Sequence, residues 1–159
     1  MTVNRTLDTP VGVREIQELI SLGATVPLTV TGSSMLPFLY SRTDTVWLSP
    51  VNTPVRPGDV LFYLRPGGAP VLHRVRRLRK DGILVMNGDA QSFCELIPPS
   101  AVVARADSHT LRGGKKRRSA RSFSLRLLWL VWYPTLRLRP ALFRLAGLKH
   151  KLFNKKGRD

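Results

Sequence analysis

The chain has 159 residues, 43% of them hydrophobic, and a formal net charge of +16. A chain of this length buries about 68–70% of its unfolded surface, which is enough for one domain with a core and an appendage. Its single cysteine, Cys94, excludes an intramolecular disulfide and is typical of a reducing compartment. Three scattered histidines and one cysteine form no metal-ligand cluster, so we expect neither a metal nor another cofactor.

The positive charge is concentrated in the last third of the chain. Residues 1–111 contain 11 Lys and Arg against 9 Asp and Glu, whereas residues 112–159 contain 15 against one acid. The body is therefore near neutral, and the tail is expected to contact something anionic or apolar. Acidic residues near the N-terminus interrupt any apolar run there, so we expect no signal peptide. The longest uncharged run in the tail, Leu127 to Leu136, has ten residues, which is too short to span a membrane. We expect a cytoplasmic protein, or one bound peripherally to a membrane.

Residues 10–22 are predicted to form a short amphipathic helix that leads into the domain, so that residues 1–23 form one segment. Pro10 suits the first turn of a helix, and Gly23 suits its end. The apolar residues between them recur at helical spacing: Val13, Ile16, Leu19 and Ile20.

Six short runs after this helix have the composition of β-strands and are separated by turns rich in Gly and Pro. The runs are 24–31, 45–48, 59–64, 70–78, 82–86 and 101–106. Short strands at close spacing are typical of a small, strongly curved sheet or partial barrel. We therefore predict a mainly β domain over residues 24–106, in which the Asp81-Gly82 turn makes a hairpin of residues 70–78 and 82–87.

The remaining residues divide into a linker and a tail. Residues 107–121 are rich in Gly, Ser and positive charge, as in a basic linker. Residues 122–159 are predicted to form a basic, apolar helical tail, with Ser122 as a helix cap, a break at Pro134 and a second helix from Pro140.

Ser34 is a candidate nucleophile. It follows Gly32 and Ser33 in a turn after an apolar strand, and such a turn can expose a hydroxyl and point backbone N–H groups at one spot. Gly-Ser turns also occur as plain connections between strands, which is the alternative interpretation for this motif alone.

His73 is a candidate general base. It lies between Val71 and Val75 on one face of a predicted strand, where a neutral imidazole near its usual pKa of about 6.5 could take a proton from a serine. For an isolated histidine, a residue at the edge of the core bonded to a carbonyl is the favoured interpretation.

Asp89 closes the next predicted strand in an Asn-Gly-Asp turn. It could accept a hydrogen bond from the imidazole and stabilise its charged form, or it could be a simple turn residue. The sequence does not fix the register that decides between the two.

Five motifs in this order resemble the boxes of type I signal peptidases. Ser34-Met35 with Pro37 matches the box around the nucleophile. The others are Asp44 before an apolar strand, Gly58-Asp59-Val60, His73-Arg74-Val75 and Gly88-Asp89. Histidine in place of lysine as the base is typical of the archaeal and endoplasmic-reticulum branch of that family. The resemblance covers about residues 24–106.

This resemblance implies a curved β fold and a Ser/His serine endopeptidase. Ser34 would attack a peptide carbonyl to form an acyl-enzyme, His73 would move the proton, and the Gly32–Ser34 turn would hold the oxyanion. Family members cut after small residues in leader or signal-like peptides. Because the chain begins with a short amphipathic helix where signal peptidases usually have a membrane segment, we expect it to be similar to the small soluble members that lack that segment.

The tail has three interpretations. It could bind an anionic membrane surface, with Trp129, Trp132 and Tyr133 at the interface and Arg137 and Arg144 on headgroups. It could cover the sheet with its apolar face. Nucleic acid is the third and less favoured partner, because Leu127–Tyr133 is too continuously apolar for a base-stacking surface. The alternative to an enzyme is a catalytically inactive β module that docks on a membrane or a partner through this tail.

Overall fold

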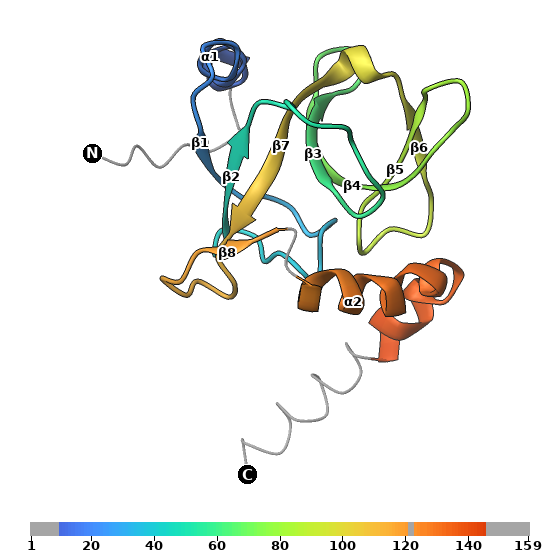
Figure 1. Cartoon of the computed structure of the whole chain (residues 1–159). Helices are drawn as coiled ribbons and strands as arrows, with labels where there is room; N and C mark the ends of the chain where they lie inside the picture. Colours follow the sequence, from blue (N-terminus) through green and yellow to red (C-terminus); the bar gives the residue numbers. More distant parts are fainter. Residues whose placement is uncertain (1–9, 121–122, 146–159) are drawn as a thin grey trace.

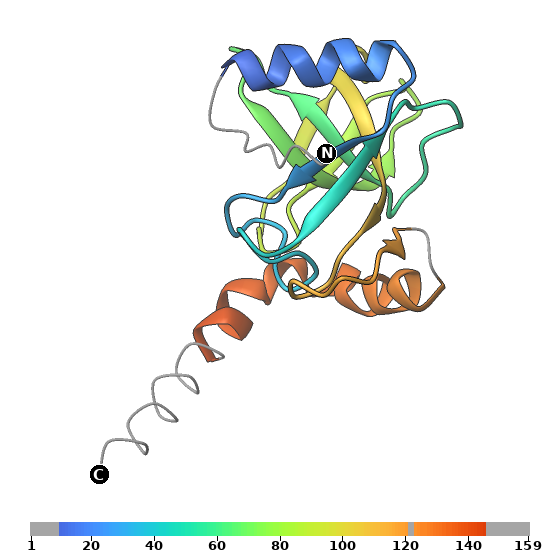
Figure 2. The ribbon, with the colours of Figure 1, turned by 90° about the vertical axis from the view of Figure 1, so that its left-hand side faces the viewer.

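The computed structural model describes residues 10–120 and 123–145, and this part of the chain is mainly β (Figure 1). One antiparallel sheet of eight strands has the order β1-β2-β7-β3-β4-β5-β6, with β8 beside β7, and it does not close. A helix, α1, lies at one end of the molecule, and the C-terminal helices lie at the other (Figures 1 and 2). The predicted class, a curved β-sheet with a short N-terminal helix and a helical tail, is confirmed.

Most predicted elements appear with shifted ends. The described elements are α1 (Pro10–Ser21), β1 (Val26–Thr29), β2 (Thr45–Ser49), β3 (Val60–Leu64), β4 (Pro70–Leu78), β5 (Leu84–Asn87), β6 (Glu95–Ile97), η1 (Pro99–Ala101), β7 (Val102–His109), β8 (Arg118–Ser119), α2 (Phe123–Trp132) and η2 (Tyr133–Arg137).

Two strands were not predicted. β6 has three residues and β8 has two, which is too short for an alternating pattern to show in a sequence. Each forms because a longer neighbour offers it a ladder: β5 pairs with β6, and the end of β7 pairs with β8. As a result, the predicted linker 107–121 is in part a strand, since β7 continues to His109.

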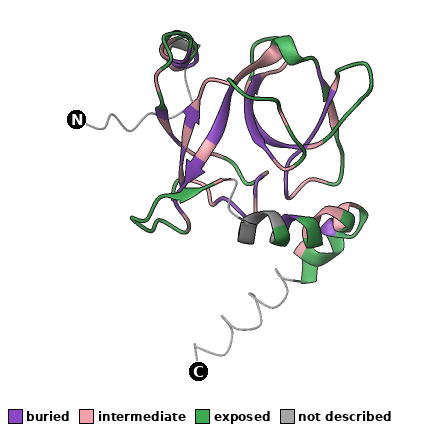
Figure 3. Cartoon of the chain, viewed as in Figure 1, coloured by how far each residue is buried: buried purple, intermediate pink, exposed green. Residues whose placement is uncertain are grey.

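The core consists of two clusters of buried side chains. Figure 3 shows that buried residues are concentrated along the strands of the sheet. The larger cluster joins α1 to β1, β2 and β7 and includes Ile16, Leu28, Leu48, Phe62 and Ala106. The smaller fills the curve formed by β3, β4, β5 and β6 and includes Leu61, Tyr63, Val75, Met86 and Ile97. Because successive strand residues face opposite sides, β3 contributes to both clusters.

The predicted hairpin is present and positions the site. β4 and β5 pair with Arg74 opposite Asn87, and a bulge lies between Val75 and Arg77. On its other side β4 pairs with β3, which puts His73 opposite Leu61, on the side of the smaller cluster.

Residues 123–145, here called the C-terminal segment, pack beneath the sheet (Figures 1 and 2). α2 ends before Pro134 as predicted, and a helical segment over 139–145 follows η2. The predicted cap Ser122 and residues 146–159 of the tail lie outside the described residues. None of the described helices has the length and apolar character needed to cross a bilayer.

Candidate active site

Ser34 lies in the loop that follows β1. Gly32 takes a left-handed conformation there, with φ of 78°, which side-chain-bearing residues rarely adopt. The next residue, Met35, is buried in the larger cluster and anchors the loop, while Ser34 remains partly exposed. The glycine therefore turns the chain so that one hydroxyl faces out and the following side chain packs inward.

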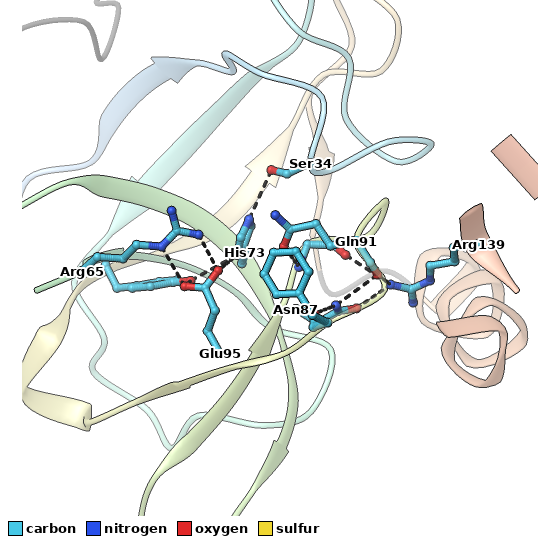
Figure 4. A network of polar contacts seen from close by, with 10 residues as sticks. Ser34, Arg65, His73, Asn87, Gln91, Glu95 and Arg139 are labelled. Atoms are coloured by element: carbon cyan, nitrogen blue, oxygen red, sulfur yellow. Dashed lines mark hydrogen bonds and ion pairs between the residues drawn. The ribbon is translucent and has the colours of Figure 1, made fainter. Parts of the chain in front are cut away.

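The structure brings Ser34 and His73 together. The Oγ of Ser34 is 3.2 Å from Nε2 of His73, although the two residues are 39 positions apart (Figure 4). The imidazole is 2% exposed, so packing holds its ring in place. This geometry lets the hydroxyl donate to the ring, as an attacking serine and its base require.

The other ring nitrogen faces a polar relay that was not predicted. Nδ1 of His73 is 3.1 Å from the hydroxyl of Tyr63, which in turn donates to Oε2 of Glu95 at 3.1 Å. Arg65 binds the same carboxylate, with its Nε donating to Oε2 at 2.8 Å and a second bond from Nη2 to Oε1. Oε1 is also 3.5 Å from Nδ1 of His73.

The relay fixes which ring nitrogen carries the proton. The arginine and the tyrosine both donate to Glu95, so the tyrosine oxygen is left to accept from Nδ1–H. Nε2 is then a free acceptor for the Ser34 hydroxyl. This is the tautomer that general-base catalysis needs.

Burial sets the protonation state of His73. It lowers the pKa of the imidazole to about 4, and the positive charge of Arg65 acts in the same direction. The negative charge of Glu95 opposes both effects, while the hydrogen bond from Arg65 lowers the pKa of the Glu95 carboxyl. The ring is thus neutral near pH 7, and a carboxylate stands ready to stabilise it once it gains a proton.

Asp89 does not contact His73, which corrects its predicted role. Its carboxylate is bound by Arg74, whose Nε donates at 3.0 and 3.1 Å and whose Nη2 donates at 2.8 Å. The reason is alternation: neighbouring residues of β4 point to opposite faces, and Asp89 lies on the face of Arg74. The pair is almost fully buried, and Nη1 of Arg74 also donates to the Gly58 carbonyl at 2.9 Å.

The Gly88-Asp89 turn instead supports the serine loop. The backbone N–H of Ala90 donates to the Ser34 carbonyl at 2.8 Å. A Cβ at Gly88 would lie 2.8 Å from that same carbonyl oxygen, so a side chain there would displace one of the two segments. The motif is therefore part of the site through the backbone, even though its carboxylate is not.

The C-terminal segment clamps this turn from outside. Nη1 of Arg139, a residue only 1% exposed, donates to the carbonyls of Gly88 and Gln91 at 3.1 and 2.9 Å and to Oδ1 of Asn87 (Figure 4). Nε1 of Trp132 donates to the Asp89 carbonyl at 2.7 Å. Nothing in the sequence singles out Arg139 from the other arginines of the tail.

The predicted interfacial aromatics pack on the domain. Trp129 is 8% exposed and lies against Gly58, Trp132 meets Phe38 edge to face, and the guanidinium of Arg76 lies 3.8 Å from the centre of the Tyr133 ring. Arg137 and Arg144 are exposed. Trp and Tyr side chains have an apolar body and a polar group, and the domain offers both apolar contacts and polar partners. These aromatic residues therefore pack on the domain and do not face outward.

Two further carboxylates of the motifs brace loops. Asp44, fully buried, accepts from the backbone N–H groups of Tyr40 and Gly113 at 2.9 and 3.0 Å. Asp59 accepts from the N–H of Arg56 at 3.0 Å. Both stabilise turns outside the Ser34–His73 pair.

A pocket of about 230 Å³ opens at Ser34 and His73. Its other lining residues are both polar and apolar: Leu28, Val30, Thr31, Met35, Arg65, Pro70, Val71, Leu72 and Gln91. The backbone N–H groups of Ser33 and Ser34 have no hydrogen-bond acceptor within the described residues. A carbonyl bound here would therefore find unsatisfied donors close to the serine hydroxyl.

Across residues 10–120 and 123–145, no cluster of three or more His, Cys, Asp or Glu side chains could hold a metal ion. Comparison of the chain with protein-family models, with curated protein sequences and with solved structures yields no match. The site's own geometry therefore carries the functional argument.

Proposed function

We propose that the protein is a serine endopeptidase of the signal-peptidase type. The observation that carries the proposal is the 3.2 Å contact between Ser34 Oγ and Nε2 of a buried, neutral His73, made at the mouth of a pocket. The order of the five motifs, and the Gly88 turn packed against Ser34, support the same assignment.

The reaction divides into two acyl transfers. Ser34 Oγ bonds to the substrate carbonyl carbon while its proton passes to Nε2 of His73, and the N–H groups of Ser33 and Ser34 hold the oxyanion. His73 then gives the proton to the leaving amine as the C–N bond breaks. Water, deprotonated by the same imidazole, releases the acid product and restores the serine.

Glu95 acts at the moment of proton transfer. Burial lowers the pKa of His73 to about 4, and the charge of Glu95, whose Oε1 lies 3.5 Å from Nδ1 of the ring, keeps the pKa from falling further. The opposite charge favours the protonated ring, so the relay assists the step in which Ser34 attacks.

The substrate class is a leader or signal-like peptide handled in the cytoplasm or at a membrane surface. The pocket beside Ser34 is small and is lined by both polar and aliphatic side chains, which suits a small side chain. Glu95 is already paired with Arg65, so we do not expect it to bind a positively charged side chain of the substrate.

The test is cleavage of a library of quenched fluorescent peptides with small residues at the scissile position. We expect Ser34→Ala and His73→Ala to abolish cleavage, while Ser100→Ala, a control at an exposed serine outside the pocket, retains it. The proposal is contradicted if either of the first two variants still cleaves. It is also contradicted if the parent protein cleaves no peptide of the library. Circular dichroism distinguishes a variant that is folded but inactive from one that is inactive because it does not fold. A catalytically inactive β module is the alternative that a negative result would favour.

A further inference from the structure

The outer side of the C-terminal segment carries an exposed apolar row. Its six members, here called the outer row, are between 40% and 67% exposed: Leu127, Leu130, Val131, Leu138, Leu142 and Leu145. The inner side of the same segment holds the buried Trp129 and Arg139. Packing on the domain therefore accounts for the aromatics but leaves the aliphatic side chains uncovered.

The outer row follows the helical repeat. Leu127, Leu130 and Val131 recur at intervals of three and four along α2. Leu138, just before the helical segment 139–145, continues this spacing with Leu142 and Leu145. Large aliphatic side chains at this spacing define one side of a helix that normally lies against an apolar phase. Isolated exposed leucines need no explanation, but a row of six on one segment does.

Cations accompany the outer row. Arg137 and Arg144 are exposed and directly precede two of its leucines. The exposed loop between β7 and β8 adds Lys115 and Lys116 at the same end of the molecule (Figures 1 and 2). The described residues 112–120 and 123–145 contain nine Lys and Arg and no Asp or Glu, so this end of the protein favours a partner that carries negative charge.

We propose that this end of the protein docks on the surface of an anionic phospholipid bilayer, with the outer row inserted among the acyl chains and the cations on the headgroups. A bilayer interface is the partner that offers an apolar phase and negative charge side by side. Nucleic acid offers charge without a phase for aliphatic side chains. The proposal is independent of catalysis, since it uses none of the residues of the Ser34 site.

The test is co-sedimentation of the full chain with phosphatidylcholine vesicles that contain or lack phosphatidylglycerol. We expect binding to the anionic vesicles only, and Leu130→Glu/Val131→Glu should weaken it at least about tenfold. The matched control is Leu22→Glu/Leu78→Glu, which adds the same charge at two exposed leucines outside the tail and should bind within about twofold of the parent. Melting curves check that both variants fold.

Charge is tested separately. Arg137→Gln/Arg144→Gln should lower the affinity for anionic vesicles by about 30-fold in total, because each cation near the surface contributes about fivefold. Equal vesicle binding by the outer-row variant and the control would overturn the proposal. Binding of the parent to duplex DNA would also overturn the proposal, if Leu130→Glu/Val131→Glu weakened that binding as much as it weakens vesicle binding. The outer row would then serve a partner other than a membrane.

Discussion

Two carboxylate–arginine pairs lie on either side of His73, and they differ in exposure. The side chains of Glu95 and Arg65 are 17% and 40% exposed, whereas those of Asp89 and Arg74 are 1% and 10% exposed. Only the first pair reaches the imidazole; the second pair supports the turn behind Ser34. Glu95 can therefore stabilise a proton on His73, whereas the buried Asp89–Arg74 pair has a structural role.

The largest difference between the pairs should be in stability. Asp89→Asn leaves Arg74 as a buried charge with its main partner weakened, and we expect a loss of about 3–5 kcal/mol in the free energy of unfolding. Glu95→Gln should cost at most about 1 kcal/mol, because water screens Arg65. Urea unfolding of both variants measures the two values. Similar losses would mean that exposure does not separate the pairs.

The next effect is the pH dependence of stability caused by His73. Its pKa is about 4 in the folded chain and about 6.5 when unfolded, so the unfolded state binds more protons between these values. Stability from this group is therefore complete above about pH 6.5 and falls as pH drops toward 4, by up to about 3 kcal/mol.

Unfolding free energies from pH 7 to pH 4 give this slope, and His73→Gln is the control that should flatten it. A parent and a variant with the same slope would assign the dependence to other groups.

A smaller effect is expected on activity. If Glu95 stabilises the imidazolium, Glu95→Gln should lower kcat by about 10- to 100-fold, less than the loss of the base itself. The acid limb of kcat/KM should lie near pH 4 in the parent, since activity needs the neutral ring, and should move lower in the variant, which lacks the charge that raises the His73 pKa. An unchanged acid limb in the variant would contradict this role.

The smallest effect concerns the clamp on the Asn87–Gln91 turn. Arg139→Met should lower kcat several-fold by loosening the turn that supports Ser34, with KM little changed, and cost about 1–3 kcal/mol of stability. Arg137→Met, an exposed neighbour, is the matched control and should leave both unchanged. Equal effects from the two variants would assign the change to lost charge.

The sequence was sufficient for the parts of the site that lie in short motifs. The Ser34 turn and the strand around His73 were identifiable because glycine placement and strand alternation are local properties. Asp89 was assigned to the wrong partner, because the side on which a turn residue emerges depends on the register of two strands. Tyr63, Arg65 and Glu95 went unnoticed, since only the curvature of the sheet brings β6 across from β3 and β4.

The tail shows the same limit. Its helices, its break at Pro134 and its charge follow from composition, but which side faces the domain does not. Trp132 and Arg139 bind carbonyls 43 and 51 positions earlier in the chain, and no local pattern marks those partners.

The most direct test of the account is to trap the acyl-enzyme. The chain is incubated with a phenyl ester of a small apolar acyl-amino acid, quenched in acid and mapped by mass spectrometry. Acylation at Ser34 in the parent and in Ser100→Ala, with its loss in His73→Ala, is the predicted result. Acylation at another residue, or equal labelling of Ser34 with and without the imidazole, would contradict an alcohol activated by His73.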